Sequence, residues 1–110
     1  MSDHLSIVAI CGSTRFRTEI AAANRALTLE GHIVLAPGVF GHHGDEITEQ
    51  QKRDLDLLHL TKVYLAHWVY VVNPGGYIGD STRREIEHAT SLGKPISYHT
   101  GPQHAEGSRS

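Results

Sequence analysis

The sequence predicts an α/β fold in which one parallel sheet of four or five strands is doubly wound, with helices on both faces. Short apolar runs without polar alternation, such as LSIVAIC at 5–11, are typical of strands that are buried on both faces. Such runs alternate with segments of helical periodicity through short loops, which indicates βαβ units. Right-handed crossovers between these units favour the strand order 2-1-3-4 and a three-layer α/β/α arrangement.

The first half of the chain predicts a strand, a helix and a second strand. Residues 5–11 form the first strand, which the loop CGSTR ends. Apolar side chains then recur at helical spacing over 16–27, and Gly31 is a suitable C-terminal stop for this helix. The run HIVLAP at 32–37 predicts the second strand, which its proline ends.

The second half of the chain predicts two further helix and strand pairs. A long helix is expected over 47–66, with leucines among its apolar positions, and HWVYVVN at 67–73 predicts the third strand. The segment STRREIEHATSLG at 81–93 predicts an amphipathic helix, and KPISYH at 94–99 predicts the fourth strand.

Length, charge and cysteine content narrow the class of protein. The 110 residues suffice for one small domain, expected over 1–100 with a flexible polar tail at 101–110. A net charge of −2 gives no general attraction to polymeric nucleic acid or to an anionic membrane, and no apolar run is long enough to span one. The single cysteine, Cys11, excludes an intrachain disulfide, and the N-terminal residues lack signal-peptide features. We therefore expect a reduced cytoplasmic protein.

The loop after the first strand offers an anion site. Ligands of doubly wound sheets bind beyond the carboxyl ends of the strands, where this loop lies. Gly12 lets a ligand approach the backbone, and Ser13 and Thr14 supply hydroxyl groups next to the N–H groups that open a helix. Arg15 adds a guanidinium that can bind phosphate in a bidentate manner. The alternative is that Ser13 or Thr14 is an ordinary helix cap.

The loop after the third strand is rich in glycine and leads into the helix that carries Glu85. Tyr77 can stack on a base or a sugar, while Thr82 and Glu85 match a T-x-x-E capping box. In that arrangement Glu85 lies in the first helical turn, where the positive end of the helix favours its ionised form, the form that a nucleophile needs. Glu85 is thus either a cap or a reagent. The candidate ligand-binding residues of this loop are Asn73, Gly76, Tyr77, Gly79, Asp80, Ser81 and Thr82.

The long helix contributes two candidates for acid–base chemistry. Asp56 and His59 are three residues apart and share one helical face, which Lys52 and Lys62 flank. The alternative is a solvated polar face. We predict no metal site, because the adjacent histidines in HHGDE at 42–46 have no second ligand pair with fixed spacing.

Three segments together resemble the nucleoside 2-deoxyribosyltransferase superfamily: ICGSTR at 10–15, LAHWVYVVN at 65–73 and GDSTRREIEHATSLGKPI at 79–96. Within it, the chain is similar to the small 2′-deoxynucleoside 5′-monophosphate N-hydrolases and to short bacterial and phage proteins with a GYIG-x-ST-x-x-EI pattern. The resemblance covers residues 5–98 and implies a flavodoxin-like domain that assembles as a homodimer or larger oligomer.

The resemblance also implies an activity and roles for individual residues. Such enzymes cleave the N-glycosidic bond of a nucleoside or nucleotide, by hydrolysis or base transfer and without a cofactor. Glu85 matches the glutamate that attacks C1′, the loop from Cys11 to Arg15 matches the pocket lining, and residues 79–82 match the sugar or phosphate contacts. Two positions depart from the pattern. Ala9 stands where the hydrolases carry a tyrosine, and His59 stands where the family places an aspartate, with Asp56 one turn earlier.

Three other readings of these motifs stay open. PGGY with the following T-x-x-E resembles the signature of cytokinin-activating phosphoribohydrolases, which also cleave a nucleotide N-glycosidic bond. GSTR after the first strand resembles flavodoxin-like FMN reductases. His59 in place of the aspartate favours a non-catalytic nucleotide-sensing module of the same fold.

Overall fold

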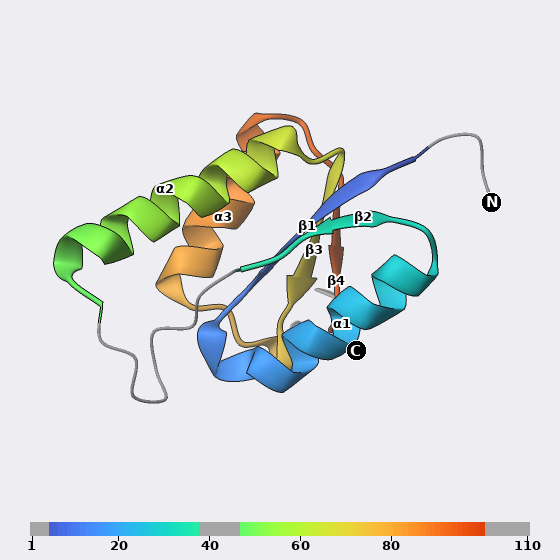
Figure 1. Ribbon diagram of the computed structural model, residues 1–110, viewed down its shortest axis with the longest axis horizontal. Coiled ribbons are helices and arrows are strands. Elements are labelled where there is room, and N and C mark those ends of the chain that lie inside the picture. Colours follow the sequence, from blue (N-terminus) through green and yellow to red (C-terminus); the bar gives the residue numbers. More distant parts are fainter. Residues whose placement is uncertain (1–4, 38–46, 101–110) are drawn as a thin grey trace.

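The computed structural model describes residues 5–37 and 47–100 and contains one sheet flanked by three helices (Figure 1). The tail predicted at 101–110 and the histidines at 42 and 43 lie outside the described residues. In chain order the elements are β1 (Ile7–Gly12), α1 (Arg17–Leu29), β2 (Ile33–Leu35), α2 (Glu49–Leu65), β3 (Trp68–Val72), α3 (Asp80–Ser91) and β4 (Ile96–Tyr98), with short 3-10 turns at Thr14–Phe16 and Pro74–Gly76.

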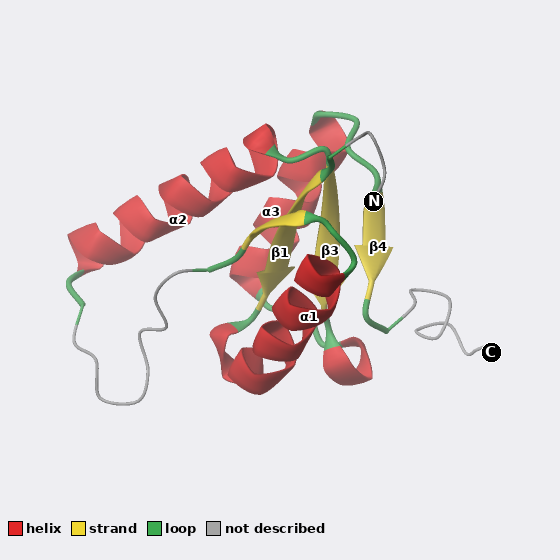
Figure 2. Ribbon diagram, turned by 45° about the vertical axis from the view of Figure 1, so that its right-hand side comes forward, coloured by secondary structure: helices red, strands yellow, loops and turns green. Residues whose placement is uncertain are grey.

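The four strands form one parallel sheet in the order β2-β1-β3-β4, which confirms the predicted fold class and strand order. In register, Ala9 of β1 pairs with Leu35 of β2 on one side and with Val69 of β3 on the other. The sheet is doubly wound, because α1 covers one face and α2 and α3 cover the other (Figures 1 and 2). The carboxyl ends of β1 and β3 therefore lie at the same edge of the sheet as the start of α3.

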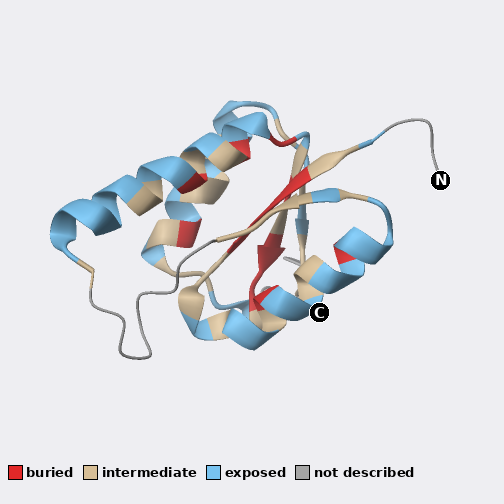
Figure 3. Cartoon of the chain, in the orientation of Figure 1, coloured by how far each residue is buried: buried red, intermediate tan, exposed pale blue. Residues whose placement is uncertain are grey.

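Alternate side chains of β1 divide the apolar core between the two faces. Val8 and Ile10 pack with residues of α1, while Ala9 and Cys11 pack with residues of α2 and α3. Figure 3 shows the resulting band of buried residues along the two central strands. Because β1 is buried on both faces, its sequence is a continuous apolar run rather than an alternating one.

The two long helices that flank the site begin differently. Thr48 caps α2 with a full capping box: its Oγ1 accepts from the Gln51 N–H at 3.0 Å, and the Gln51 side chain accepts from the Thr48 N–H at 2.9 Å. By contrast, α3 begins at Asp80 after an N-terminal Gly79 that makes no side-chain cap.

The capping box predicted for Thr82 and Glu85 is therefore wrong. Helix α3 begins two residues before Thr82, whose side chain is buried inside the helix and only 2% exposed. Glu85 consequently lies in the second turn, beyond the free N–H groups of the helix start, and the predicted helix-end stabilisation of its ionised form does not apply.

Among the described residues, no helix has the length and apolar character needed to cross a membrane.

Candidate active site

A pocket of about 730 Å³ opens beyond the carboxyl ends of β1 and β3, between α2 and α3. Its volume lies within the range of roughly 300 to 1,000 Å³ that is usual for small-molecule sites. Most of the residues predicted from the sequence line it: Gly12, Ser13, Thr14, Asp56, His59, Tyr77, Gly79, Asp80, Ser81, Thr82 and Glu85. Arg15, Asn73 and Gly76 do not line it.

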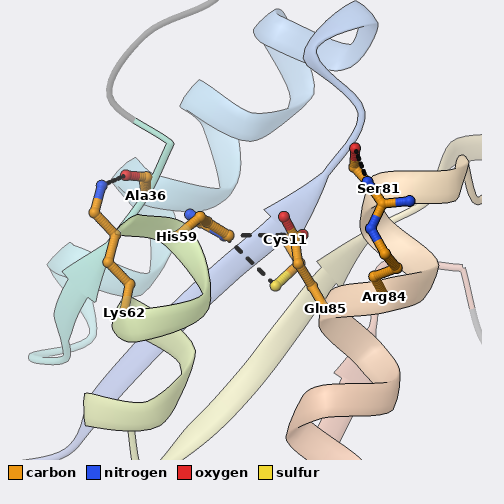
Figure 4. A network of polar contacts seen from close by, with 7 residues as sticks. All are labelled: Cys11, Ala36, His59, Lys62, Ser81, Arg84 and Glu85. Carbon is orange, nitrogen blue, oxygen red and sulfur yellow. Dashed lines mark hydrogen bonds and ion pairs between the residues drawn. The ribbon is translucent and has the colours of Figure 1, made fainter. Parts of the chain in front are cut away.

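Three polar side chains from three different elements meet beside this pocket, and two of them, His59 and Glu85, line it (Figure 4). The Nε2 atom of His59 on α2 lies 3.6 Å from the Sγ atom of Cys11 on β1 and 3.9 Å from Oε1 of Glu85 on α3. Cys11 is fully buried, and the side chains of His59 and Glu85 are 10% and 12% exposed. We call Cys11, His59 and Glu85 the buried cluster.

The local folding of each element explains how the buried cluster forms. Cys11 belongs to the face of β1 that packs against α2 and α3. His59 precedes the buried Val63 by one helical turn, so both face the sheet. Glu85 lies between Thr82 and Ala89, the two buried residues of α3, and therefore points into the same layer.

Gly12 places the following loop close to β3. A Cβ atom at this position would lie only 2.9 Å from the backbone oxygen of Val72, so any side chain would push the two strands apart. The absence of a side chain keeps the pocket mouth next to the end of β3.

Burial changes the protonation of all three members of the buried cluster. It raises the pKa of Glu85 to about 7, and the negative charge of Asp56 contributes to this rise. It lowers the pKa of His59 to about 4, with a further contribution from the positive charge of Lys62. Burial also raises the pKa of the Cys11 thiol well above its usual value. Near neutral pH the histidine and the thiol are thus uncharged, while Glu85 is close to half ionised.

Asp56 and Lys62 complete the polar wall that α2 contributes. Asp56 is half-buried and lines the pocket one turn before His59, as the shared helical face predicts. The alternative of a solvated polar face fails for His59, which is only 8% exposed. The Nζ atom of Lys62 donates to the backbone oxygen of Ala36 at 2.7 Å, which ties α2 to the segment after β2 (Figure 4).

Arg15 lies beside the pocket, stacked on one of its lining residues. Its guanidinium carbon is 4.2 Å from the centroid of the Tyr77 ring, and Phe16 contacts the same ring edge to face at 5.7 Å. Ser13 accepts a hydrogen bond from the Arg15 N–H at 3.3 Å, so the capping alternative holds for this serine as well. Arg15 is exposed and can reach a ligand only from the rim.

Asn73 holds the sheet together at this edge instead of lining the pocket. It is 3% exposed, its Nδ2 donates to the backbone oxygen of Thr100 at 3.0 Å, and its Oδ1 accepts from the Thr100 N–H at 2.8 Å. Gly76 adopts a positive φ of 84° in the turn that follows, a conformation that glycine tolerates best. Both residues shape the loop that carries Tyr77.

Sequence reasoning missed part of the site. Four pocket residues of α2 were not expected to line it, namely Leu55, Leu58, Thr61 and Leu65. Their spacing of three and four residues is the signal that could have placed them on one face with Lys62. The contact of Cys11 with His59 and Glu85 was also missed, and no local pattern signals it.

The pocket can bind a polar small molecule and present it with a buried carboxyl group. Hydroxyl groups come from the loop after β1, an aromatic ring from the loop before α3, and three carboxyl groups from the facing helices. No protein-family model matches this chain, and no curated protein matches it significantly.

Proposed function

We propose that this chain cleaves the N-glycosidic bond of a nucleoside or nucleoside 5′-monophosphate, with Glu85 as the nucleophile that attacks C1′. The observation that carries the proposal is the position of Glu85, a buried carboxyl group at the inner end of the pocket into which the loops after β1 and β3 open. A carboxyl group whose pKa burial raises to about 7 is poised to react near neutral pH.

The proposed reaction is a double displacement. An oxygen of ionised Glu85 forms a bond to C1′ as the C1′–N bond breaks, and the bonding electrons leave with the base. Water or a second base then attacks C1′ and releases the glutamate. The reaction uses no cofactor.

The departing base needs a proton and takes it from water, because Asp56 is negatively charged beside Glu85. Near neutral pH His59 is an uncharged imidazole and has no extra proton to give, since its pKa is lowered to about 4. The proposal therefore gives His59 a positioning role beside Glu85. The Asp56 carboxylate, on the same wall of the pocket, accepts a proton from the water that attacks C1′ in the second step.

The pocket rim supports recognition of a nucleotide. Ser13 and Thr14 place hydroxyl groups at the mouth, and Tyr77 presents a ring that is 41% exposed and can stack on a base. Arg15, stacked on that ring, is close enough to the rim to contact a 5′-phosphate.

The exposed face of α2 supports a homodimer. Leu57, Leu58, Tyr64 and Leu65 are 57–64% exposed, and their spacing places them along one side of the helix. Because Leu58 and Leu65 also line the pocket, a second copy packed there would complete its outer wall.

The single cysteine, buried and unpaired, fits a reducing compartment such as the cytoplasm.

The second candidate is a non-catalytic nucleotide-binding module of the same fold. It is favoured by the uncharged His59 beside Glu85, at the position where the resembled enzymes carry an aspartate. This candidate keeps the pocket and its rim and removes only the chemical step.

One experiment separates the two candidates. The protein, kept with a chelator, is incubated with a panel of nucleosides and 5′-monophosphates, and both ligand binding and free-base release are measured. The proposal expects catalytic release of base from at least one compound. Binding without release would favour the module, and neither binding nor release would contradict both.

A further inference from the structure

The buried cluster has the composition of a metal site. It brings together a sulfur, an imidazole nitrogen and a carboxylate oxygen, and these three atoms all lie within 4.8 Å of one another. They come from β1, α2 and α3, so the packing of the three elements holds them near one another before any ion binds.

The sulfur–nitrogen distance in the buried cluster matches a tetrahedral zinc site, and the nitrogen–oxygen distance is about half an ångström longer than in such a site. With Zn–S of about 2.3 Å and Zn–N and Zn–O of about 2.1 Å, a tetrahedral ion separates sulfur from nitrogen by about 3.6 Å and nitrogen from oxygen by about 3.4 Å. The structure has 3.6 Å between Cys11 Sγ and His59 Nε2, and 3.9 Å between His59 Nε2 and Glu85 Oε1. A movement of the Glu85 Oε1 atom toward His59 by about half an ångström would bring the nitrogen–oxygen distance to the tetrahedral value.

Few competing interactions would have to break. Within the described ranges, the second ring nitrogen of His59 is buried and has no hydrogen-bond partner. Glu85 has polar contacts with Cys11 and His59, the other two members of the cluster. The side chains are therefore available to a ligand that satisfies all three.

We infer that Cys11, His59 and Glu85 form a binding site for zinc or a similar borderline-soft divalent cation, with its fourth coordination position open to the pocket. A thiolate, an imidazole and a carboxylate select such ions over Mg²⁺ and Ca²⁺, which prefer sites built from oxygen alone. Binding displaces the thiol proton to solvent, so one thiolate and one carboxylate balance the two charges of the ion.

If Glu85 is the nucleophile of the proposed function, zinc binding inhibits base release. The metal site itself does not depend on that function. Glu85 cannot ligate the ion and attack C1′ at the same time. Zinc is therefore a reversible inhibitor of base release, removed by a chelator.

Cobalt binding to the purified protein tests the site without any substrate. Cys11 is the only cysteine of the chain, so a thiolate-to-cobalt charge-transfer band can arise from this residue alone. Wild-type protein titrated with Co²⁺ should develop that band to one equivalent, together with the visible spectrum of tetrahedral cobalt. Zn²⁺ should then abolish both signals by displacement.

Single substitutions identify the ligands. Cys11→Ala should lose the charge-transfer band entirely. His59→Gln and Glu85→Gln should bind Zn²⁺ at least about a hundredfold more weakly in competition with a chromophoric chelator, since even the loss of an outer-shell partner costs 10–100-fold. Glu87→Gln on the exposed side of α3 and His42→Gln with His43→Gln should bind as wild type does.

Circular dichroism of each variant distinguishes the loss of a metal ligand from the loss of the fold. The inference is overturned if folded wild-type protein gives no charge-transfer band with cobalt. It is equally overturned if Glu85→Gln and His59→Gln keep wild-type zinc affinity. Base release measured with a chelator is unaffected by either result, so failure of the metal site and failure of the proposed function remain distinguishable.

Discussion

The Nε2 atom of His59 lies 3.9 Å from Oε1 of Glu85 in a nearly enclosed space, yet the two side chains do not form an ion pair. The pKa of His59 is lowered to about 4 and that of Glu85 is raised to about 7. Between these values both groups are mainly uncharged, and above them only Glu85 carries a charge. Burial thus outweighs the mutual attraction of the pair, and Glu85 is left with an unusually basic carboxylate.

The first prediction is a rate that rises with pH. If ionised Glu85 is the nucleophile, kcat/KM for base release should increase about tenfold per pH unit below about pH 7 and level off above it. Asp56→Asn should move the inflection to lower pH, because the charge of Asp56 raises the pKa of Glu85. The profile is measured on chelator-treated enzyme, and a rate that falls through pH 7 would mean that Glu85 acts in its protonated form.

The second prediction concerns stability. The pKa of Glu85 is raised on folding from 4.5 to about 7, so its protonated form favours the folded state. This stabilisation of the folded state is fully present below the pKa that Glu85 has in the unfolded chain. It is lost as the pH rises through the pKa that Glu85 has in the folded protein, and the loss is up to about 3 kcal/mol. Glu85→Gln escapes this cost, so its stability relative to wild type should grow between about pH 4.5 and pH 8.

Urea unfolding of the metal-free proteins at both pH values measures this effect. Glu87→Gln on the same helix is the matched control. The difference between its free energy of unfolding and that of the wild type should be the same at both pH values. The contribution of His59 is common to wild type and Glu85→Gln and cancels in their comparison. A difference between these two that does not change with pH would contradict the burial argument.

The third prediction concerns Arg15. If its guanidinium binds a 5′-phosphate from the rim, monophosphates should bind better than the corresponding nucleosides. Arg15→Ala should erase that preference, at a cost of about 1.5 to 3 kcal/mol for a lost charge-assisted contact. Arg25→Ala, an exposed arginine on α1, should leave it intact. Calorimetry with matched nucleoside and nucleotide pairs decides, and equal affinities in the wild type would remove the phosphate from the proposal.

The fourth prediction concerns assembly. Leu57 on α2 is 64% exposed, and Leu57→Glu should convert a homodimer into a monomer by placing a charge in the proposed interface. Leu29→Glu on α1, where the leucine is 70% exposed, is the control and should stay dimeric. Light scattering at micromolar concentration measures both, and a monomeric wild type would exclude this interface.

The fold could be predicted because its signals are local. The apolar run of β1 and the helical periodicity between the strands each depend on nearby residues, and parallel connectivity then restricts the strand order. The capping boxes show the limit of such reasoning. Thr48 with Gln51 and Thr82 with Glu85 carry the same pattern, but only the first pair caps a helix. Packing distinguishes the two pairs, because the Thr82 side chain is buried in the core.

The buried cluster could not be predicted from spacing. Cys11 and His59 are 48 residues apart, and their contact depends on how α2 lies across the sheet. An apolar neighbourhood indicates a structural thiol at Cys11, and a lone histidine on a helix gives no sign of which residues face it. The carboxyl group of Glu85 was correctly placed at the pocket, but its helical position and the direction of its pKa shift follow only from the structure.

Base release by Glu85→Gln tests the central claim most directly. Glutamine preserves the size of the side chain and cannot act as a carboxylate nucleophile. On a substrate that the wild type cleaves, metal-free Glu85→Gln should therefore be slower by at least roughly a thousandfold, about 4 kcal/mol of barrier. Glu87→Gln should keep wild-type turnover in the same assay. A folded Glu85→Gln variant that retained near wild-type turnover would contradict the claim that Glu85 attacks the sugar.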